Sequence, residues 1–201
     1  MRRVGVMGGT FDPIHYGHLV TAEQARVDLD LDLVIFVPSG NPWQKHEISA
    51  AELRYLMTVL ATSANPAFTV SRLEIDRSGP TYTVETLRAL RDEWTGDRLF
   101  FVTGADAILD ILTWKDAQEC LELAEFVAAT RPGYDLGKLE ARGIRKLVAV
   151  LDVPALAISS TDLRQRFHQE RPVRYQMPRE VEEFARKHGL YGTGGNGLVR
   201  E

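Results

Sequence analysis

Short apolar runs and longer amphipathic stretches alternate along this chain. The apolar runs are almost continuous and rich in Val, Ile and Phe: Val4–Met7, Leu33–Val37, Leu99–Thr103, Phe126–Ala129 and Leu147–Leu151. Runs of this length are typical of strands that are buried on both faces, as in a parallel sheet. Phe68–Leu73 is a further strand candidate.

Between these runs, hydrophobic residues recur every three or four positions, which places them on one face of a helix. The predicted helices are His18–Leu29, Ala50–Ser63, Thr83–Trp94, Asp106–Leu112, Ala117–Leu123, Thr161–Phe167 and Arg179–His188. Strands that alternate with helices predict an α/β fold with a doubly wound, mostly parallel sheet.

The length of 201 residues suits one domain, and no repeat or Ser/Pro-rich linker interrupts the pattern. We therefore predict a single domain over residues 1–192. The piece Lys138–Lys146 is expected to form a surface excursion from it. Residues 193–201 include three glycines and are expected to form a flexible tail. A hydrophobic fraction of 44% with 26% charged residues excludes an intrinsically disordered chain.

Composition also limits the compartment and the partners. The one cysteine, Cys120, cannot form an internal disulfide, and its leucine-rich surroundings predict a buried thiol in a reducing compartment. No segment is long and apolar enough for a membrane helix, and Met1–Met7 is too short for a signal peptide. We expect a cytoplasmic protein without a membrane partner. The net charge of −4 argues against a general nucleic-acid binder, although a local basic pocket is compatible with it.

The most informative stretch reads Gly8-Gly9-Thr10-Phe11-Asp12-Pro13-Ile14-His15-Tyr16-Gly17-His18 and joins the first strand to the first helix. In open α/β sheets, ligands bind at the carboxyl ends of the strands. The paired glycines allow a ligand to approach the backbone, and the N–H groups at the start of a helix favour an anion. The stretch contains neither the dinucleotide pattern G-x-G-x-x-G nor a Walker A loop.

His15 and His18 are three residues apart, so their side chains are expected to be neighbours. Two imidazoles at a helix start can donate hydrogen bonds to phosphate oxygens. The alternative is that the two histidines bind a metal ion, but no third ligand occurs at the usual spacing. Because the glycine-rich turn precedes them, we expect phosphate contacts rather than two surface histidines.

At these residues the chain resembles the nucleotidylyltransferase superfamily, whose signature is G-x-F-D-P-x-H-x-G-H. Members of that superfamily transfer a nucleotidyl group from a nucleoside triphosphate to a phosphate-bearing acceptor. Ile158-Ser159-Ser160-Thr161-Asp162-Leu163-Arg164 is similar to its second motif, I-S-S-T-x-[IL]-R. Ser and Thr can cap a helix that starts near Thr161, and Arg164 with the exposed N–H groups can hold a triphosphate.

Length and internal landmarks over residues 3–192 look most like the bacterial nicotinate-nucleotide adenylyltransferase family. Pro38–Lys45 resembles the family's loop with an ATP-contacting lysine. Many relatives have P-P-H-K there, whereas this chain has Pro42-Trp43-Gln44-Lys45-His46. The resemblance therefore implies Lys45 as a phosphate contact and assigns no role to Trp43 or His46.

Three further landmarks resemble the same family: Thr81–Leu87 ([ST]-Y-T-x-x-T-L), Gly104-Ala105-Asp106 (G-A-D), and the pairs Trp114-Lys115 and Arg131-Pro132-Gly133 (W-K, R-P-G). The resemblance implies that the threonines hold the nicotinate nucleotide, Asp106 contacts ribose hydroxyls and Trp114 stacks on the nicotinate ring. Taken alone, Trp114 suits a core aromatic, Asp106 a helix cap and Arg131 a loop charge.

The implied catalytic set is His15, His18, Lys45 and Arg164. The implied ATP contacts are Gly8, Gly9, Thr10, Phe11, His15, His18, Lys45, Gly104, Asp106, Ile158, Ser159, Ser160, Thr161 and Arg164. The implied nicotinate-nucleotide contacts are Thr83, Thr86, Asp106, Trp114, Lys115 and Arg131.

The implied reaction joins ATP and nicotinate mononucleotide into nicotinate adenine dinucleotide and pyrophosphate. Mg²⁺ is expected as cofactor, bound mainly through the ATP phosphates, so no metal-ligand residue is named. Two alternatives stay open: another adenylyl- or cytidylyltransferase of the superfamily, such as phosphopantetheine adenylyltransferase, and a non-catalytic nucleotide-binding regulatory module. The family forms dimers and higher assemblies, which leaves the oligomeric state open.

Overall fold

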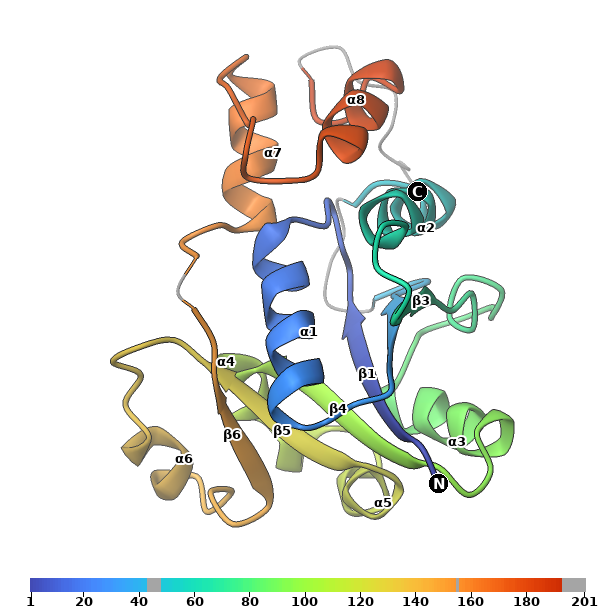
Figure 1. Cartoon of the computed structure of the whole chain (residues 1–201), viewed down its shortest axis with the longest axis vertical. Coiled ribbons are helices and arrows are strands. Elements are labelled where there is room, and N and C mark those ends of the chain that lie inside the picture. The colour runs from blue at the N-terminus through green and yellow to red at the C-terminus, as the bar shows by residue number, and fades with distance from the viewer. Residues whose placement is uncertain (43–47, 155, 193–201) are drawn as a thin grey trace. The chain divides into compact units, whose positions relative to one another are not determined.

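The computed structural model describes residues 1–42, 48–154 and 156–192 (Figure 1). Six strands form one sheet in the order β3-β2-β1-β4-β5-β6, the doubly wound arrangement. Within it, β1 pairs with β4, β4 with β5 and β5 with β6, each in parallel. The predicted fold class is therefore confirmed. The strands are β1 Arg3–Gly9, β2 Leu33–Pro38, β3 Phe68–Val70, β4 Arg98–Gly104, β5 Glu125–Thr130 and β6 Val148–Asp152.

The central strands β1, β2, β4 and β5 are buried on both faces, as their unbroken apolar runs predicted, whereas β3 and the edge strand β6 are partly exposed. Val4 and Val127, for example, have no exposed surface, and Phe101 pairs with Phe126 across β4 and β5. The helices are α1 Tyr16–Asp28, α2 Ala51–Thr62, α3 Thr83–Glu93, α4 Ala105–Ile108, α5 Ala117–Leu123, α6 Gly137–Ala141, α7 Ser160–His168 and α8 Arg179–Lys187, with a 3₁₀ helix η1 at Ile111–Thr113.

Three predicted segments differ in detail. The strand predicted over Phe68–Leu73 ends at Val70, because the chain turns away after Ser71. The helix predicted over Asp106–Leu112 is split into α4 and η1, and Ile108 and Ile111 are both fully buried. The expected surface excursion at residues 138–146 contains α6, whose Leu139 is fully buried.

The chain folds into two compact units that interleave along the sequence. Unit 1 comprises Met1–Gly8, Val20–Ile35 and Thr81–Ala155, and within it α3 packs against α5. Unit 2 comprises Gly9–Leu19, Phe36–Pro80 and Leu156–Glu201, and within it α2 packs against α8 and β3 (Figure 1). The single domain over residues 1–192 stays a prediction, and the expected tail at 193–201 lies outside the described residues. In the described part of the chain, no helix combines the length and the apolar character needed to cross a membrane.

Cys120 gives a first test of this packing. Its side chain on α5 is fully buried, and burial, reinforced by the carboxylates of Glu119 and Asp116, raises the pKa of the thiol to about 11. Since the thiolate is the reactive species, the native protein should resist alkylation by iodoacetamide at pH 8. The protein unfolded in guanidinium chloride should be alkylated once, as mass spectrometry would record. Equal labelling rates in both states would contradict the buried placement.

Candidate active site

The glycine-rich turn after β1 is held by local packing. Phe11 adopts a left-handed backbone with φ of 50°. A Cβ on Gly9 would lie only 2.8 Å from the Phe11 ring, so the turn needs glycine at this position. The Gly9 carbonyl accepts a hydrogen bond from the Ser39 amide at 2.8 Å. Close packing of Phe11 is thus a structural reason for Gly9, in addition to the expected ligand approach.

The two histidines lie together at the start of α1. Their rings stack with centroids 3.8 Å apart, and the His15 side chain is buried. His15 precedes the helix by one residue, and its amide donates to Nδ1 of His18 at 3.2 Å. Because Nδ1 of His18 accepts this bond, the neutral ring carries its proton on Nε2. An edge-on contact with Phe11, at 5.1 Å between ring centroids, further fixes the orientation of His18.

The second motif is bonded directly to the first, although the two are far apart in sequence. Ser159 caps α7 by accepting from the Asp162 amide at 3.1 Å, which agrees with the predicted helix start. The Ser160 hydroxyl donates to the Pro13 carbonyl at 2.9 Å. Arg164 donates to the Asp12 carbonyl at 2.7 Å and to the Thr161 hydroxyl at 3.3 Å. We call Asp12, His15, His18, Ser160 and Arg164 the signature cluster.

The Asp12 carboxylate has partners that were not predicted from the sequence. Asp12 is buried, and its carboxylate accepts from the Ser49 amide at 3.1 Å and from the Tyr191 hydroxyl at 2.5 Å. Burial and the nearby Asp12 carboxylate raise the pKa of Tyr191 well above its usual value, so the phenol stays a hydrogen-bond donor. Tyr191 follows α8, and no periodicity or spacing in the sequence pointed to it.

A second group of predicted residues gathers in unit 1. Lys115 donates to a carboxylate oxygen of Glu85 at 2.7 Å and lies 4.3 Å from the centre of the Tyr82 ring. This bond to Glu85 raises the pKa of Lys115. Trp114 is half-buried and meets Phe101 edge-on, with ring centroids 6.3 Å apart. The W-K pair and the T-Y-T-V-E-T-L segment are therefore physically joined, and we call Tyr82, Glu85, Trp114 and Lys115 the Trp114 cluster.

The other predicted residues of unit 1 follow the parallel strands or begin α3. Asp106 lies in the first turn of α4 after β4, and the cap position there is Gly104, so the alternative of Asp106 as a cap is wrong. Arg131 is exposed directly after β5, which pairs in parallel with β4. Thr83 is the first residue of α3, and Thr86 on that helix is buried with its hydroxyl 3.4 Å from the Tyr82 carbonyl.

Three further predicted ATP contacts make no described side-chain hydrogen bond to the signature cluster. Gly8 lies within β1, and Ile158 is half-buried just before the α7 cap. Lys45 lies outside the described residues, together with Trp43 and His46. Its predicted phosphate contact stays a prediction.

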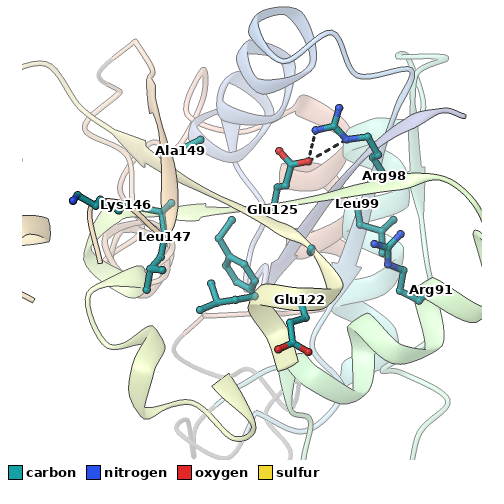
Figure 2. A pocket seen from close by; sticks show the side chains of 12 residues that line it. Arg91, Arg98, Leu99, Glu122, Glu125, Lys146, Leu147 and Ala149 are labelled. Atoms are coloured by element: carbon teal, nitrogen blue, oxygen red, sulfur yellow. Dashed lines mark hydrogen bonds and ion pairs between the residues drawn. The ribbon is translucent and has the colours of Figure 1, made fainter. Parts of the chain in front are cut away.

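A pocket of about 550 Å³ opens in unit 1 at the amino ends of the strands (Figure 2). Its walls come largely from the first residues of β4, β5 and β6, and Figure 2 shows Arg98 ion-paired with Glu125 there. The residues that line it include none of the predicted site residues. In unit 1, Asp106 and Arg131 instead follow the carboxyl ends of β4 and β5, where ligands of open α/β sheets bind.

Comparison with known proteins identifies the family. The cytidylyltransferase-like family matches residues 6–166, which is most of the chain. A protein of Leifsonia xyli subsp. xyli, named probable nicotinate-nucleotide adenylyltransferase, is 56% identical over 190 residues that cover 94% of each chain. This chain belongs to the nicotinate-nucleotide adenylyltransferase family. Another such relative, from Moorella thermoacetica, is 54% identical over 199 residues that cover 94% of this chain and 91% of its own.

Solved nicotinic acid mononucleotide adenylyltransferase structures share the fold. The Plasmodium falciparum enzyme complexed with NaAD superposes with a TM-score of 0.80 at 19% identity, covering 95% of this chain and 98% of that one. The same enzyme complexed with APC gives a TM-score of 0.77 over the same shares. At this identity the likeness establishes the adenylyltransferase fold alone.

The Tyr191–Asp12 bond in this family member can be tested by a pair of tyrosine variants. Tyr191→Phe removes a hydrogen bond to a buried carboxylate, so the free energy of unfolding should fall by about 1–3 kcal/mol. Tyr175→Phe is the matched control, because Tyr175 also has a left-handed backbone but is 85% exposed. Urea unfolding followed by circular dichroism measures both variants. Equal effects of the two substitutions would contradict the role of the bond.

Proposed function

We propose that this chain transfers the adenylyl group of ATP to nicotinate mononucleotide, releasing nicotinate adenine dinucleotide and pyrophosphate. The observation that carries the proposal is the direct bonding of the two superfamily motifs, Arg164 to Asp12 and Ser160 to Pro13. The names of the relatives, which share more than half of their residues with this chain, support the same reaction. The Plasmodium structure with NaAD concerns a related enzyme bound to the dinucleotide that we expect as product.

The chemistry needs alignment more than activation. The 5′-phosphate of the acceptor is ionised at neutral pH, so it needs no general base. One of its oxygens attacks the α-phosphorus of ATP, a new P–O bond forms, and the bond to the bridging oxygen of the β-phosphate breaks. The electron pair leaves with pyrophosphate. The protein must then hold two polyanions in line and stabilise the charge on the transferred and leaving groups.

On the ATP side, the signature cluster supplies the donors. We expect His18 to donate from Nε2 to a phosphate oxygen, because its Nδ1 is already the acceptor of the His15 amide. The His15 ring stacks on the His18 ring, and we expect His15 to contact the phosphates as well. Arg164 adds positive charge while it holds the turn, and Lys45 is expected to complete the cationic set.

On the acceptor side, the Trp114 cluster suits a flat, electron-poor ring. The indole of Trp114 is half-buried and lies nearly perpendicular to the Phe101 ring, and we expect its exposed part to stack on nicotinate. We expect Asp106 to accept from ribose hydroxyls and Thr83 and Thr86 to line the same site. The ion pair of Lys115 with Glu85 fixes the segment beside the tryptophan, and Arg131 contributes a positive charge after β5.

Mg²⁺ is expected to enter as part of the ATP complex. Its oxygen ligands would then be phosphate groups and water, and its charge would stabilise the pyrophosphate leaving group. We expect small-molecule substrates only, a cytoplasmic location and no nucleic-acid partner.

The acceptor assignment can be tested directly by measuring pyrophosphate release. The purified protein with Mg²⁺ and ATP is given nicotinate mononucleotide, nicotinamide mononucleotide or phosphopantetheine in parallel. We expect the highest kcat/KM with nicotinate mononucleotide. Faster turnover of phosphopantetheine, or of CTP in place of ATP, would assign the chain to another branch of the superfamily. A complete lack of acceptor-dependent release would favour a regulatory module.

The role of His18 is tested by alanine substitution. His18→Ala removes the donor aimed at the phosphates, so kcat should fall by at least about 10²-fold, as for other donors of this kind. His168→Ala is the control, since His168 is an exposed histidine in the last turn of α7. Both variants should melt within a few degrees of the wild type. Near-wild-type turnover by His18→Ala would contradict the assignment.

A further inference from the structure

Arg54 is a buried cation that the proposed mechanism does not use. It lies in the first turns of α2, and none of its surface is exposed. Burying a guanidinium ion is costly unless its N–H groups are hydrogen-bonded. Burial lowers the pKa of Arg54, and the negative charges of Asp12 and Glu74 act in the opposite direction. An arginine stays charged even so, because its usual pKa is so high.

The guanidinium group joins three segments of the chain through their backbone. Its Nε donates to the Ser49 carbonyl, its Nη1 to the Thr10 carbonyl and its Nη2 to the Gly40 carbonyl, each at 2.9 Å. The planar fork of an arginine fixes the relative positions of its acceptors more strictly than a flexible ammonium group can. One rigid side chain therefore sets the distances between these three points.

Each of the three points belongs to a segment that bears on the proposed ATP site. Thr10 lies in the signature turn between Gly9 and Phe11. Ser49 is bonded to the same turn, because its amide donates a hydrogen bond to the Asp12 carboxylate at 3.1 Å. Arg54 and Asp12 thus hold the same residue, Ser49, through its carbonyl and its amide.

Gly40 shows how closely the third segment is held. A Cβ at this position would lie 1.9 Å from the Glu74 carbonyl oxygen, so only glycine fits. The Gly40 carbonyl accepts a hydrogen bond from Arg54, and the backbone of Glu74 fills the space where a Gly40 side chain would lie. The chain after β2 consequently has little freedom to move away from Arg54 at this point.

We propose that Arg54 is a positioning residue for the triphosphate, which sets the spacing between the signature turn and the chain that follows β2. Arg54 acts through the backbone of Thr10, Gly40 and Ser49 rather than by touching the substrate. Loss of the fork would let the turn shift, and displacements of about 1 Å in such sites can reduce rates by about 10²-fold. The inference rests on the proposed function for its ATP site but not on the identity of the acceptor.

The test compares Arg54→Lys and Arg54→Gln with the wild type. The lysine variant keeps the charge without the planar fork, and the glutamine variant removes the buried charge, so the two substitutions disturb the site in different ways. Thr62→Val is the matched control, because Thr62 is a buried polar residue on α2 whose hydroxyl bonds only to carbonyls of its own helix. Calorimetry well below the melting temperature measures the dissociation constants of Mg-ATP and of nicotinate mononucleotide separately, followed by steady-state kinetics.

We expect the Kd for ATP to rise about tenfold in the folded Arg54 variants, and kcat/KM for ATP to fall by about 10²-fold. The Kd for nicotinate mononucleotide should stay within twofold, and Thr62→Val should leave both constants unchanged. A merely structural role would reduce the fraction of active protein without changing the Kd of the folded part. An unchanged Kd for ATP, or failure of both variants to fold, would overturn the proposal.

The results distinguish a failure of the Arg54 proposal from a failure of the proposed function. A wild-type protein that binds ATP but does not consume nicotinate mononucleotide contradicts the proposed acceptor, while the ATP affinities of the variants can still be compared. A wild type that consumes nicotinate mononucleotide while the variants bind ATP normally contradicts only the role of Arg54. A wild type without affinity for ATP contradicts both.

Discussion

Hydrogen bonds to backbone carbonyls hold the signature turn in place, and the proposed ATP site depends on them. The Gly9, Thr10, Asp12 and Pro13 carbonyls each accept one bond from a distant segment of the chain. The donors are the Ser39 amide, Arg54, Arg164 and the Ser160 hydroxyl. These bonds fix a turn that contains a left-handed Phe11, a backbone state that costs roughly 1–3 kcal/mol for a residue with a side chain. The turn therefore keeps its shape because other segments hold it there.

This arrangement suits a reaction in which the protein contributes position and charge. The His15 amide orients His18, the two rings stack, and Nε2 is the donor nitrogen of the neutral His18 ring. Donors that are fixed before the substrate arrives cost no reorganisation during the reaction, which is the physical basis of electrostatic catalysis. The Trp114 cluster follows the same principle, since its lysine is tied to Glu85 and its tryptophan to a core phenylalanine.

The fold and the motifs could be predicted from the sequence, whereas the residues that hold the motifs in place could not. Strands such as β1 and β4 were predictable because a strand buried on both faces needs an unbroken apolar run. The signature residues were predictable because glycine, histidine and arginine occur there in a distinctive order. Arg54 was not predictable, since an arginine on a predicted helix is usually exposed and its three acceptors are carbonyls that every residue has. Tyr191 was missed for a related reason, because its partner Asp12 is far away in sequence.

We propose that the adenylyl group passes from ATP to the acceptor in one displacement, supported by position and charge, without an adenylyl group bound to the protein. The direct measurement uses one diastereomer of adenosine 5′-O-(1-thiotriphosphate), whose α-phosphorus is chiral, with nicotinate mononucleotide as acceptor. Phosphorus NMR of the resulting dinucleotide reports the configuration at that atom. A single in-line displacement predicts inversion. Retention would require two displacements through an adenylylated side chain, with His15 or His18 as its natural site, and would contradict this account.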